Sequence, residues 1–175
     1  MKTVGDKAPD FSVSGVINGK TGKFSLKSFK SGWLVLFFYP KDFTFICPTE
    51  IKAFNETVSD FKQLGCEVAG VSIDSVETHQ SWIQELGGLN YPLLSDPDRK
   101  LCEAYGVFNS EEKVANRASF IIDPKQTIRY AVVYHVNVGR SVEETLRVLK
   151  ALQTQKLCPA DWKPGEETGD LSNRF

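Results

Sequence analysis

Hydrophobic and polar positions along the chain predict a strand, a helix and a second strand in succession. The run 33–39 is continuously apolar, which is typical of a strand buried on both faces of a sheet. After Pro48, apolar residues recur at helical spacing over about 48–63, and Gly65 ends that helix. A second apolar run, 66–73, then predicts a β-α-β unit with a parallel pair of strands.

The same pattern predicts further elements on both sides of this unit. Residues 1–30 alternate short apolar pieces with glycines, which predicts a small hairpin that closes one edge of the sheet. Downstream we expect a helix after Ser75, a loop with a short strand at 91–97, a short helix at 98–105, a polar loop at 109–116, a hairpin of strands 118–122 and 128–134, and a helix opened by the capping box Ser141 to Glu144. The result is one α/β domain over residues 1–175, with a mixed central sheet, helices on both faces and a C-terminal tail from about 157 to 175.

Composition and charge narrow the classes of function. The chain has 175 residues, 41% of them hydrophobic and 25% charged, which is ordinary for one globular domain. A net charge of −1 without a tract of Lys or Arg gives no electrostatic case for binding nucleic acid or an anionic membrane. No apolar run resembles a signal peptide or is long enough to span a bilayer, so we expect a cytoplasmic protein.

The four cysteines, Cys47, Cys66, Cys102 and Cys158, contain no Cys-x-x-Cys pair. The two histidines form no ligand pair with any of them in sequence, so we expect no metal site. We also expect no bound cofactor. In the cytoplasm the thiols should be reduced at rest, and a disulfide would be catalytic. Cys66 opens a predicted interior strand and Cys102 lies on a short helix, so both are expected to be packing residues.

Cys47 differs from the other cysteines because it lies where the helix is predicted to begin. The free N–H groups and the positive end of the dipole at a helix start favour a thiolate over a thiol. Pro48 fits the first helical turn, where its missing N–H has no partner to lose. Cys47 is therefore a candidate nucleophile, and the ordinary alternative is a small buried core residue.

Two stretches closely resemble two-cysteine peroxiredoxins of the alkyl hydroperoxide reductase and thioredoxin peroxidase kind. They are Phe-Phe-Tyr-Pro-Lys-Asp-Phe-Thr-Phe-Ile-Cys-Pro-Thr-Glu at 37–50 and Cys-Pro-Ala-Asp-Trp-Lys-Pro-Gly at 158–165, and the likeness covers roughly Val4 to Gly165. The resemblance implies a thioredoxin-like fold and a peroxidase for hydrogen peroxide and organic hydroperoxides that serves antioxidant defence. It also implies that Cys47 becomes a sulfenic acid, that Cys158 is the resolving thiol, and that thioredoxin or a flavoprotein disulfide reductase recycles the disulfide.

The resemblance assigns roles to five further residues. Arg117 would hold the thiolate and donate to the peroxide, although an isolated arginine is more often a solvated surface charge. Thr44 would hydrogen-bond thiolate and peroxide, or it could cap the helix. Pro40 would shield the site, or simply end the strand. Glu50 and Arg140 fit the supporting polar network around Arg117, with Arg140 following its strand after fewer residues than in many relatives.

The resemblance also implies a homodimer with two intersubunit disulfides, formed through the edge strand 128–134, and assembly into a ring such as a decamer. Two other classes of protein compete with this interpretation. A thioredoxin-type reductase needs Cys-x-x-Cys, and Glu50 stands where its second cysteine would be. A ring-forming chaperone has no visible sequence signature, and peroxide turnover with purified thioredoxin separates it from the enzyme.

Overall fold

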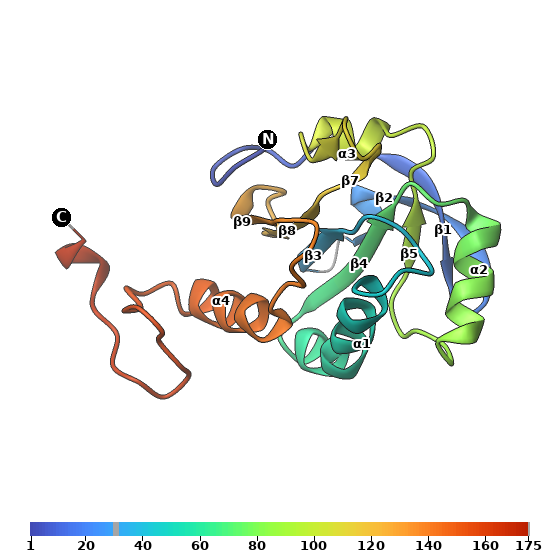
Figure 1. Ribbon diagram of the computed structural model, residues 1–175. Coiled ribbons are helices and arrows are strands. Elements are labelled where there is room, and N and C mark those ends of the chain that lie inside the picture. Colours follow the sequence, from blue (N-terminus) through green and yellow to red (C-terminus); the bar gives the residue numbers. More distant parts are fainter. Residues whose placement is uncertain (30–31, 175) are drawn as a thin grey trace. The chain divides into compact units, whose positions relative to one another are not determined.

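The computed structural model describes residues 1–29 and 32–174, and over these residues it has a mixed seven-stranded sheet, a two-stranded sheet and helices (Figure 1). The strands are β1 (Ser12–Ile17), β2 (Lys20–Ser25), β3 (Trp33–Phe38), β4 (Cys66–Ser72), β5 (Leu93–Ser95), β6 (Phe108–Asn109), β7 (Val114–Ala115), β8 (Arg117–Ile122) and β9 (Ile128–Tyr134). The helices are α1 (Cys47–Gln63), α2 (Val76–Glu85), α3 (Lys100–Ala104) and α4 (Val142–Thr154), with the 3-10 turns η1 (Leu26–Phe29) and η2 (Leu171–Asn173). Within this described part, no helix combines the length and the apolarity that crossing a membrane requires.

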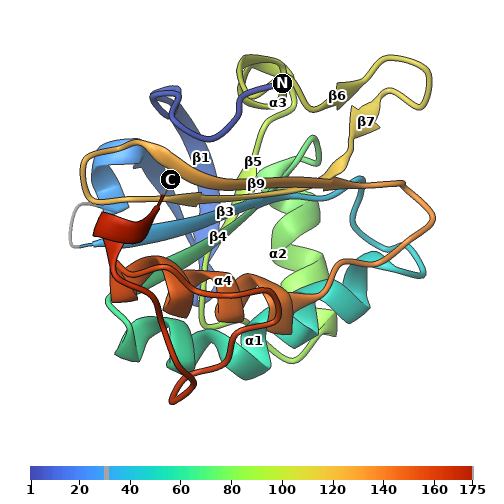
Figure 2. The ribbon, with the colours of Figure 1, turned by 90° about the vertical axis from the view of Figure 1, so that its left-hand side faces the viewer.

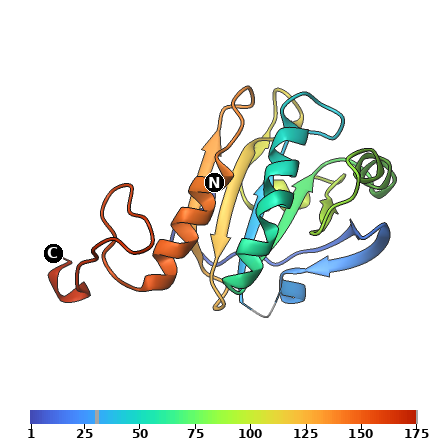
Figure 3. The same cartoon turned by 90° about the horizontal axis from the view of Figure 1, so that it is seen from below.

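The sheet order β2-β1-β5-β4-β3-β8-β9 confirms the predicted mixed architecture. Strands β3, β4 and β5 run parallel, whereas the remaining neighbours are antiparallel. The β3-α1-β4 unit predicted from the apolar runs is present, and α1 lies against the sheet (Figure 3). The predicted N-terminal hairpin is β1 with β2 and forms one edge, although residue 30, at the end of the expected segment, lies outside the described residues.

Strand β3 is buried on both faces, because its side chains alternate between two layers of helix. On one face the ring of Phe37 stacks on Phe54 of α1, with 4.2 Å between ring centroids. On the other face Phe38 packs against Tyr105, which directly follows α3, at 5.2 Å. Gly70 makes room for Phe37, since a Cβ atom there would lie 2.7 Å from the ring. The predicted placement of helices on both faces is therefore confirmed.

The segment 109–116 differs from its prediction as a polar loop. Phe108 pairs with Ala115 and Asn109 with Val114, so β6 and β7 form a separate two-stranded sheet (Figure 2). The side chain of Asn109 accepts hydrogen bonds from the backbone N–H groups of Glu111 and Glu112, which stabilises the turn between them. Strands of two residues leave no periodic pattern in a sequence, and this hairpin was missed for that reason.

The chain divides into two compact units, Met1–Arg140 and Ser141–Phe175. The division falls before α4, whereas the C-terminal tail was expected to begin at about residue 157. The assignment of the whole chain to one domain stays a prediction. In the second unit Ser141 caps α4 by accepting the N–H of Glu144. The carboxylate of Glu144 pairs with Arg147 at 2.6 Å, so the expected capping box is only half formed. Beyond α4, Leu157 and Gly169 pair as an isolated bridge.

Cys66 and Cys102 lie in the interior, as expected for packing residues. Cys66 opens β4 and Cys102 lies on α3, and each is about 1% exposed. Each thiol donates to a nearby backbone carbonyl, that of Glu67 for Cys66 and that of Arg99 for Cys102. Burial raises the pKa of both thiols to about 12.

Both thiols should therefore resist alkylation in the folded protein. A thiol whose pKa is raised to about 12 stays protonated at pH 8, and the thiolate is the reactive form. We expect brief treatment of the reduced native protein with iodoacetamide to leave Cys66 and Cys102 unlabelled, and treatment in urea to label both. Peptide mass spectrometry measures this directly. Equal labelling of Cys66 with and without urea would contradict its assignment to the core.

Candidate active site

The site is built where the buried strand β3 passes into helix α1. Pro40 is half-buried just after the strand, and an exposed loop leads from it to Cys47, the first residue of α1. The sulfur-bearing side chain of Cys47 is fully buried, at 0% exposure. Pro48 occupies the first turn as predicted, and Thr49 donates its hydroxyl to the carbonyl of Ile46 at 2.6 Å. The local sequence thus places a thiol at a helix start, against the end of a rigid strand.

A buried polar cluster anchors the loop that precedes Cys47. One carboxylate oxygen of Asp42 accepts the hydroxyl of Tyr39 at 2.7 Å, and the other lies 2.7 Å from Nδ1 of His79 on α2. The backbone N–H of Asp42 donates to Asp74 at 2.9 Å. Burial raises the pKa of the Asp42 carboxyl, while the bond to His79 acts in the opposite direction. The start of the loop is therefore anchored at Asp42, whereas Phe45 further along it is 92% exposed.

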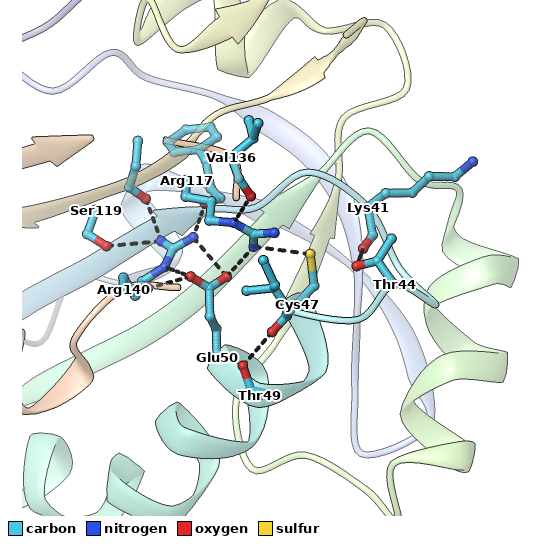
Figure 4. A network of polar contacts seen from close by, with 12 residues as sticks. Lys41, Thr44, Cys47, Thr49, Glu50, Arg117, Ser119, Val136 and Arg140 are labelled. Atoms are coloured by element: carbon cyan, nitrogen blue, oxygen red, sulfur yellow. Dashed lines mark hydrogen bonds and ion pairs between the residues drawn. The ribbon is translucent and has the colours of Figure 1, made fainter. Parts of the chain in front are cut away.

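Arg117, the first residue of β8, brings a positive charge to the thiol. Its Nη1 lies 3.3 Å from Sγ of Cys47 and 2.7 Å from Oε2 of Glu50 (Figure 4). Its Nε donates to the backbone carbonyl of Val136 at 2.7 Å. The side chain is 4% exposed, so Arg117 is not the solvated surface charge that its type alone favours.

Arg140 binds mainly the carboxylate oxygen of Glu50 that Arg117 does not contact. Both its backbone N–H and its Nε donate to Oε1 of Glu50 at 2.9 Å, and Nη2 reaches Oε2 at 3.4 Å. The remaining guanidinium donors go to the carbonyls of Ala118 and Phe38 and to the hydroxyl of Ser119. Glu50 therefore lies between two arginines, as Figure 4 shows.

The charges of this buried cluster do not cancel. Arg117, Arg140 and Glu50 together carry two positive charges and one negative charge, and all three side chains are at most 4% exposed. An uncompensated buried charge is costly, and a neighbouring anion relieves that cost. Cys47 lies within hydrogen-bond distance of Arg117, so a negative charge on its sulfur would offset the excess positive charge of the cluster. The arrangement therefore suits a nucleophilic sulfur.

The other candidate residues belong to the segment before Cys47 or to the second compact unit. The hydroxyl of Thr44 donates to the carbonyl of Lys41 at 3.1 Å, and Figure 4 shows it on the loop side of Cys47. It does not cap α1, whose cap position is Ile46. Cys158 belongs to the second unit, where it is half-buried and lies 3.4 Å from the hydroxyl of Thr154. The roles of Thr44, Pro40 and Cys158 stay predictions.

Two members of the network were missed by the sequence analysis. Ser119 left a signal, because it is a lone hydroxyl in the otherwise apolar run 118–122. Val136 left none, since it contributes a backbone carbonyl that any residue carries. Among the described residues, no group of three or more His, Cys, Asp or Glu side chains could hold a metal ion.

Comparison with known proteins assigns this chain to a family. The family model AhpC/TSA matches residues 4–131. The chain is 48% identical to "Putative peroxiredoxin YkuU" of Bacillus subtilis (strain 168), a match that covers 95% of this chain and 98% of that protein. It is also 48% identical to "Peroxiredoxin-2" of Macaca fascicularis, over 94% of this chain and 88% of the relative.

Solved structures give the same result. A reduced 2-Cys peroxiredoxin of Plasmodium vivax superposes with a TM-score of 0.89 at 33% identity, covering 96% of this chain and 93% of that one. The AhpC of Mycobacterium tuberculosis superposes with a TM-score of 0.85 at 38% identity, covering 93% and 99%. The predicted thioredoxin-like fold is confirmed by these likenesses. The chain belongs to the AhpC/TSA family and is a peroxiredoxin, a peroxidase whose chemistry depends on a thiol.

Proposed function

We propose that Cys47 is the peroxidatic cysteine and that the enzyme reduces hydrogen peroxide and organic hydroperoxides. The observation that carries this proposal is the 3.3 Å contact between Nη1 of Arg117 and the sulfur of Cys47, inside a cluster with one excess positive charge. A thiolate is the form of cysteine that attacks peroxides, and a fixed guanidinium favours that form. Among the described residues, the other three thiols bond to backbone carbonyls and, for Cys158, to the Thr154 hydroxyl, and not to a guanidinium group.

The first step transfers one oxygen atom to the sulfur. The Cys47 thiolate attacks the terminal peroxide oxygen, a sulfur–oxygen bond forms and the oxygen–oxygen bond breaks. The sulfur is oxidised to sulfenic acid, and the leaving oxygen, which takes the electron pair, picks up a proton as water or alcohol. Arg117 can donate to the oxygen on which negative charge develops, while Glu50 fixes its guanidinium. Thr44 on the loop and Pro40 behind it would orient the peroxide and exclude water.

The second step joins Cys47 to Cys158. The Cys158 thiolate attacks the sulfur of the sulfenic acid, a disulfide forms, and the hydroxyl leaves as water once protonated. Cys47 is fully buried in the folded site, so its sulfur must first be exposed by opening of the first turn of α1. That turn has no side-chain cap that would have to break when it opens.

We further propose that the resolving Cys158 comes from a second copy of the chain. Strand β9 is the edge of the seven-stranded sheet in the described residues, and an open edge can pair with the same edge of a partner across a two-fold axis. Such a homodimer would carry two intersubunit disulfides. Further association into a ring such as a decamer fits the exposed apolar residues Phe45 and Val138 beside the site.

A dithiol protein completes the cycle by reducing the disulfide, and we propose thioredoxin or a flavoprotein disulfide reductase for this role. The reductant supplies two electrons and two protons, which regenerate both thiols. We propose that the enzyme lies in the cytoplasm, where such dithiols are kept reduced, and that it serves antioxidant defence.

Replacing the nucleophile tests the function. We expect Cys47→Ser to abolish peroxide reduction, because a hydroxyl of ordinary acidity gives almost no anion near neutral pH. Cys66→Ser is the matched control, since it removes a buried thiol that lies in the core and should keep turnover. Peroxide consumption with purified thioredoxin, thioredoxin reductase and NADPH measures both variants. Turnover by Cys47→Ser close to that of the wild type would end the proposal.

Replacing the second cysteine tests the resolving step. In Cys158→Ser the first oxidation should proceed at the normal rate, whereas recycling by thioredoxin should stop because no disulfide forms. A stoichiometric burst of peroxide loss without turnover is the expected signature. On a non-reducing gel the oxidised wild type should run as a dimer and Cys158→Ser as a monomer. A wild type that stays monomeric on that gel while cycling would rule out the intersubunit bond.

A further inference from the structure

Ser119 carries a hydroxyl in strand β8, whose other residues are apolar except for Arg117. All six residues of β8 are buried, and Ser119 is 1% exposed. It lies directly opposite Phe37 of β3 in the antiparallel register, so the two side chains share one face of the sheet. The guanidinium of Arg140 lies over the Phe37 ring on that face, 5.1 Å from its centroid. Ser119 is therefore a small polar residue next to Phe37, on the face of the sheet that the Arg140 guanidinium covers.

Arg140 uses every donor of its guanidinium, and the Ser119 hydroxyl completes the set. Nε and one Nη2 donor go to Glu50, and the other Nη2 donor goes to the carbonyl of Phe38. Of the Nη1 donors, one goes to the carbonyl of Ala118 at 2.8 Å and one to Oγ of Ser119 at 3.0 Å. A guanidinium has five N–H groups, so none is left over. Loss of the hydroxyl would leave a buried, charged donor without an acceptor.

We infer that Ser119 is a positioning residue for the peroxidatic site, acting through Arg140 and Glu50 on Arg117. The inference rests on the proposed role of Cys47. Oε2 of Glu50 accepts a strong bond from Arg117 at 2.7 Å and a long one from Nη2 of Arg140 at 3.4 Å. If Arg140 loses its bond to Ser119, its guanidinium keeps its other partners but loses one of the contacts that fix its orientation, so Nη2 can move closer to Oε2 and compete with Arg117. The carboxylate then holds Arg117 less firmly against the sulfur.

The test removes the hydroxyl and measures the chemistry of Cys47. We expect Ser119→Ala to slow the second-order oxidation of Cys47 by hydrogen peroxide about threefold to tenfold, the size of effect that one hydrogen bond to a charged group can transmit. The pH profile of this rate should shift toward higher pH, because the thiolate is less well stabilised. Ser119→Thr keeps the hydroxyl and should restore most of the rate. Tyr105→Phe also removes a buried hydroxyl, from the opposite face of the sheet, and should change stability without changing the pH profile.

A second pair of variants shows whether the effect passes through Arg140. In an Arg140→Lys background the hydroxyl has lost its partner, so adding Ser119→Ala should cause no further fall in rate. Two outcomes would overturn the inference: a folded Ser119→Ala with the wild-type rate and pH profile, or full additivity with Arg140→Lys. These failures differ from failure of the proposed function, which is decided by turnover in Cys47→Ser alone.

Discussion

A single buried carboxylate, Glu50, is the constraint on which the site depends. It accepts hydrogen bonds from two arginines that come from separate parts of the chain. Arg117 also bonds to the carbonyl of Val136, and Arg140 to two backbone carbonyls and the hydroxyl of Ser119. Two buried guanidinium groups beside one carboxylate leave an excess positive charge. Burying such a charge is unfavourable unless another anion lies close by, and a negative charge on the sulfur of Cys47 would meet that need. The same buried charges that link β8 to α1 therefore face the sulfur.

The fold explains how these groups reach one another. Cys47 and Glu50 lie on the first turn of α1, one helical turn apart, so both point toward β3 and β8. Arg117 begins β8, next to β3 in the sheet, and Arg140 ends the first compact unit. The rigid sheet positions the charges, whereas the loop before Cys47 is exposed at its tip. A buried sulfur beside an exposed loop is consistent with a cycle in which the site is closed for peroxide attack and open for disulfide formation.

Most of the fold, but only part of the site, could be predicted from the sequence. Continuous apolar runs at β3 and β4 and helical spacing after Pro48 were enough to predict the central β-α-β unit, because buried strands and amphipathic helices leave periodic patterns. The two-residue strands β6 and β7 are too short to leave a periodic pattern in the sequence. The contact between Cys47 and Arg117 spans 70 positions, so local pattern could not predict it, and only the resemblance did. The carbonyl of Val136 is invisible in sequence, and the hydroxyl of Ser119 could have been noticed only as an exception in an apolar strand.

We propose that Arg117 favours the Cys47 thiolate through an oriented guanidinium, not through charge alone. The most direct measurement is the rate constant for oxidation of Cys47 by hydrogen peroxide, followed by rapid mixing in Arg117→Gln and Arg117→Lys, with Arg99→Gln as the control. We expect Arg117→Gln to lose about one to two decades in rate, the cost of one charged hydrogen bond. Arg117→Lys should also be slow, because an ammonium cannot bind Val136, Glu50 and the sulfur in the same geometry. Folded Arg117→Gln protein that reacts as fast as the wild type and the control would contradict the account.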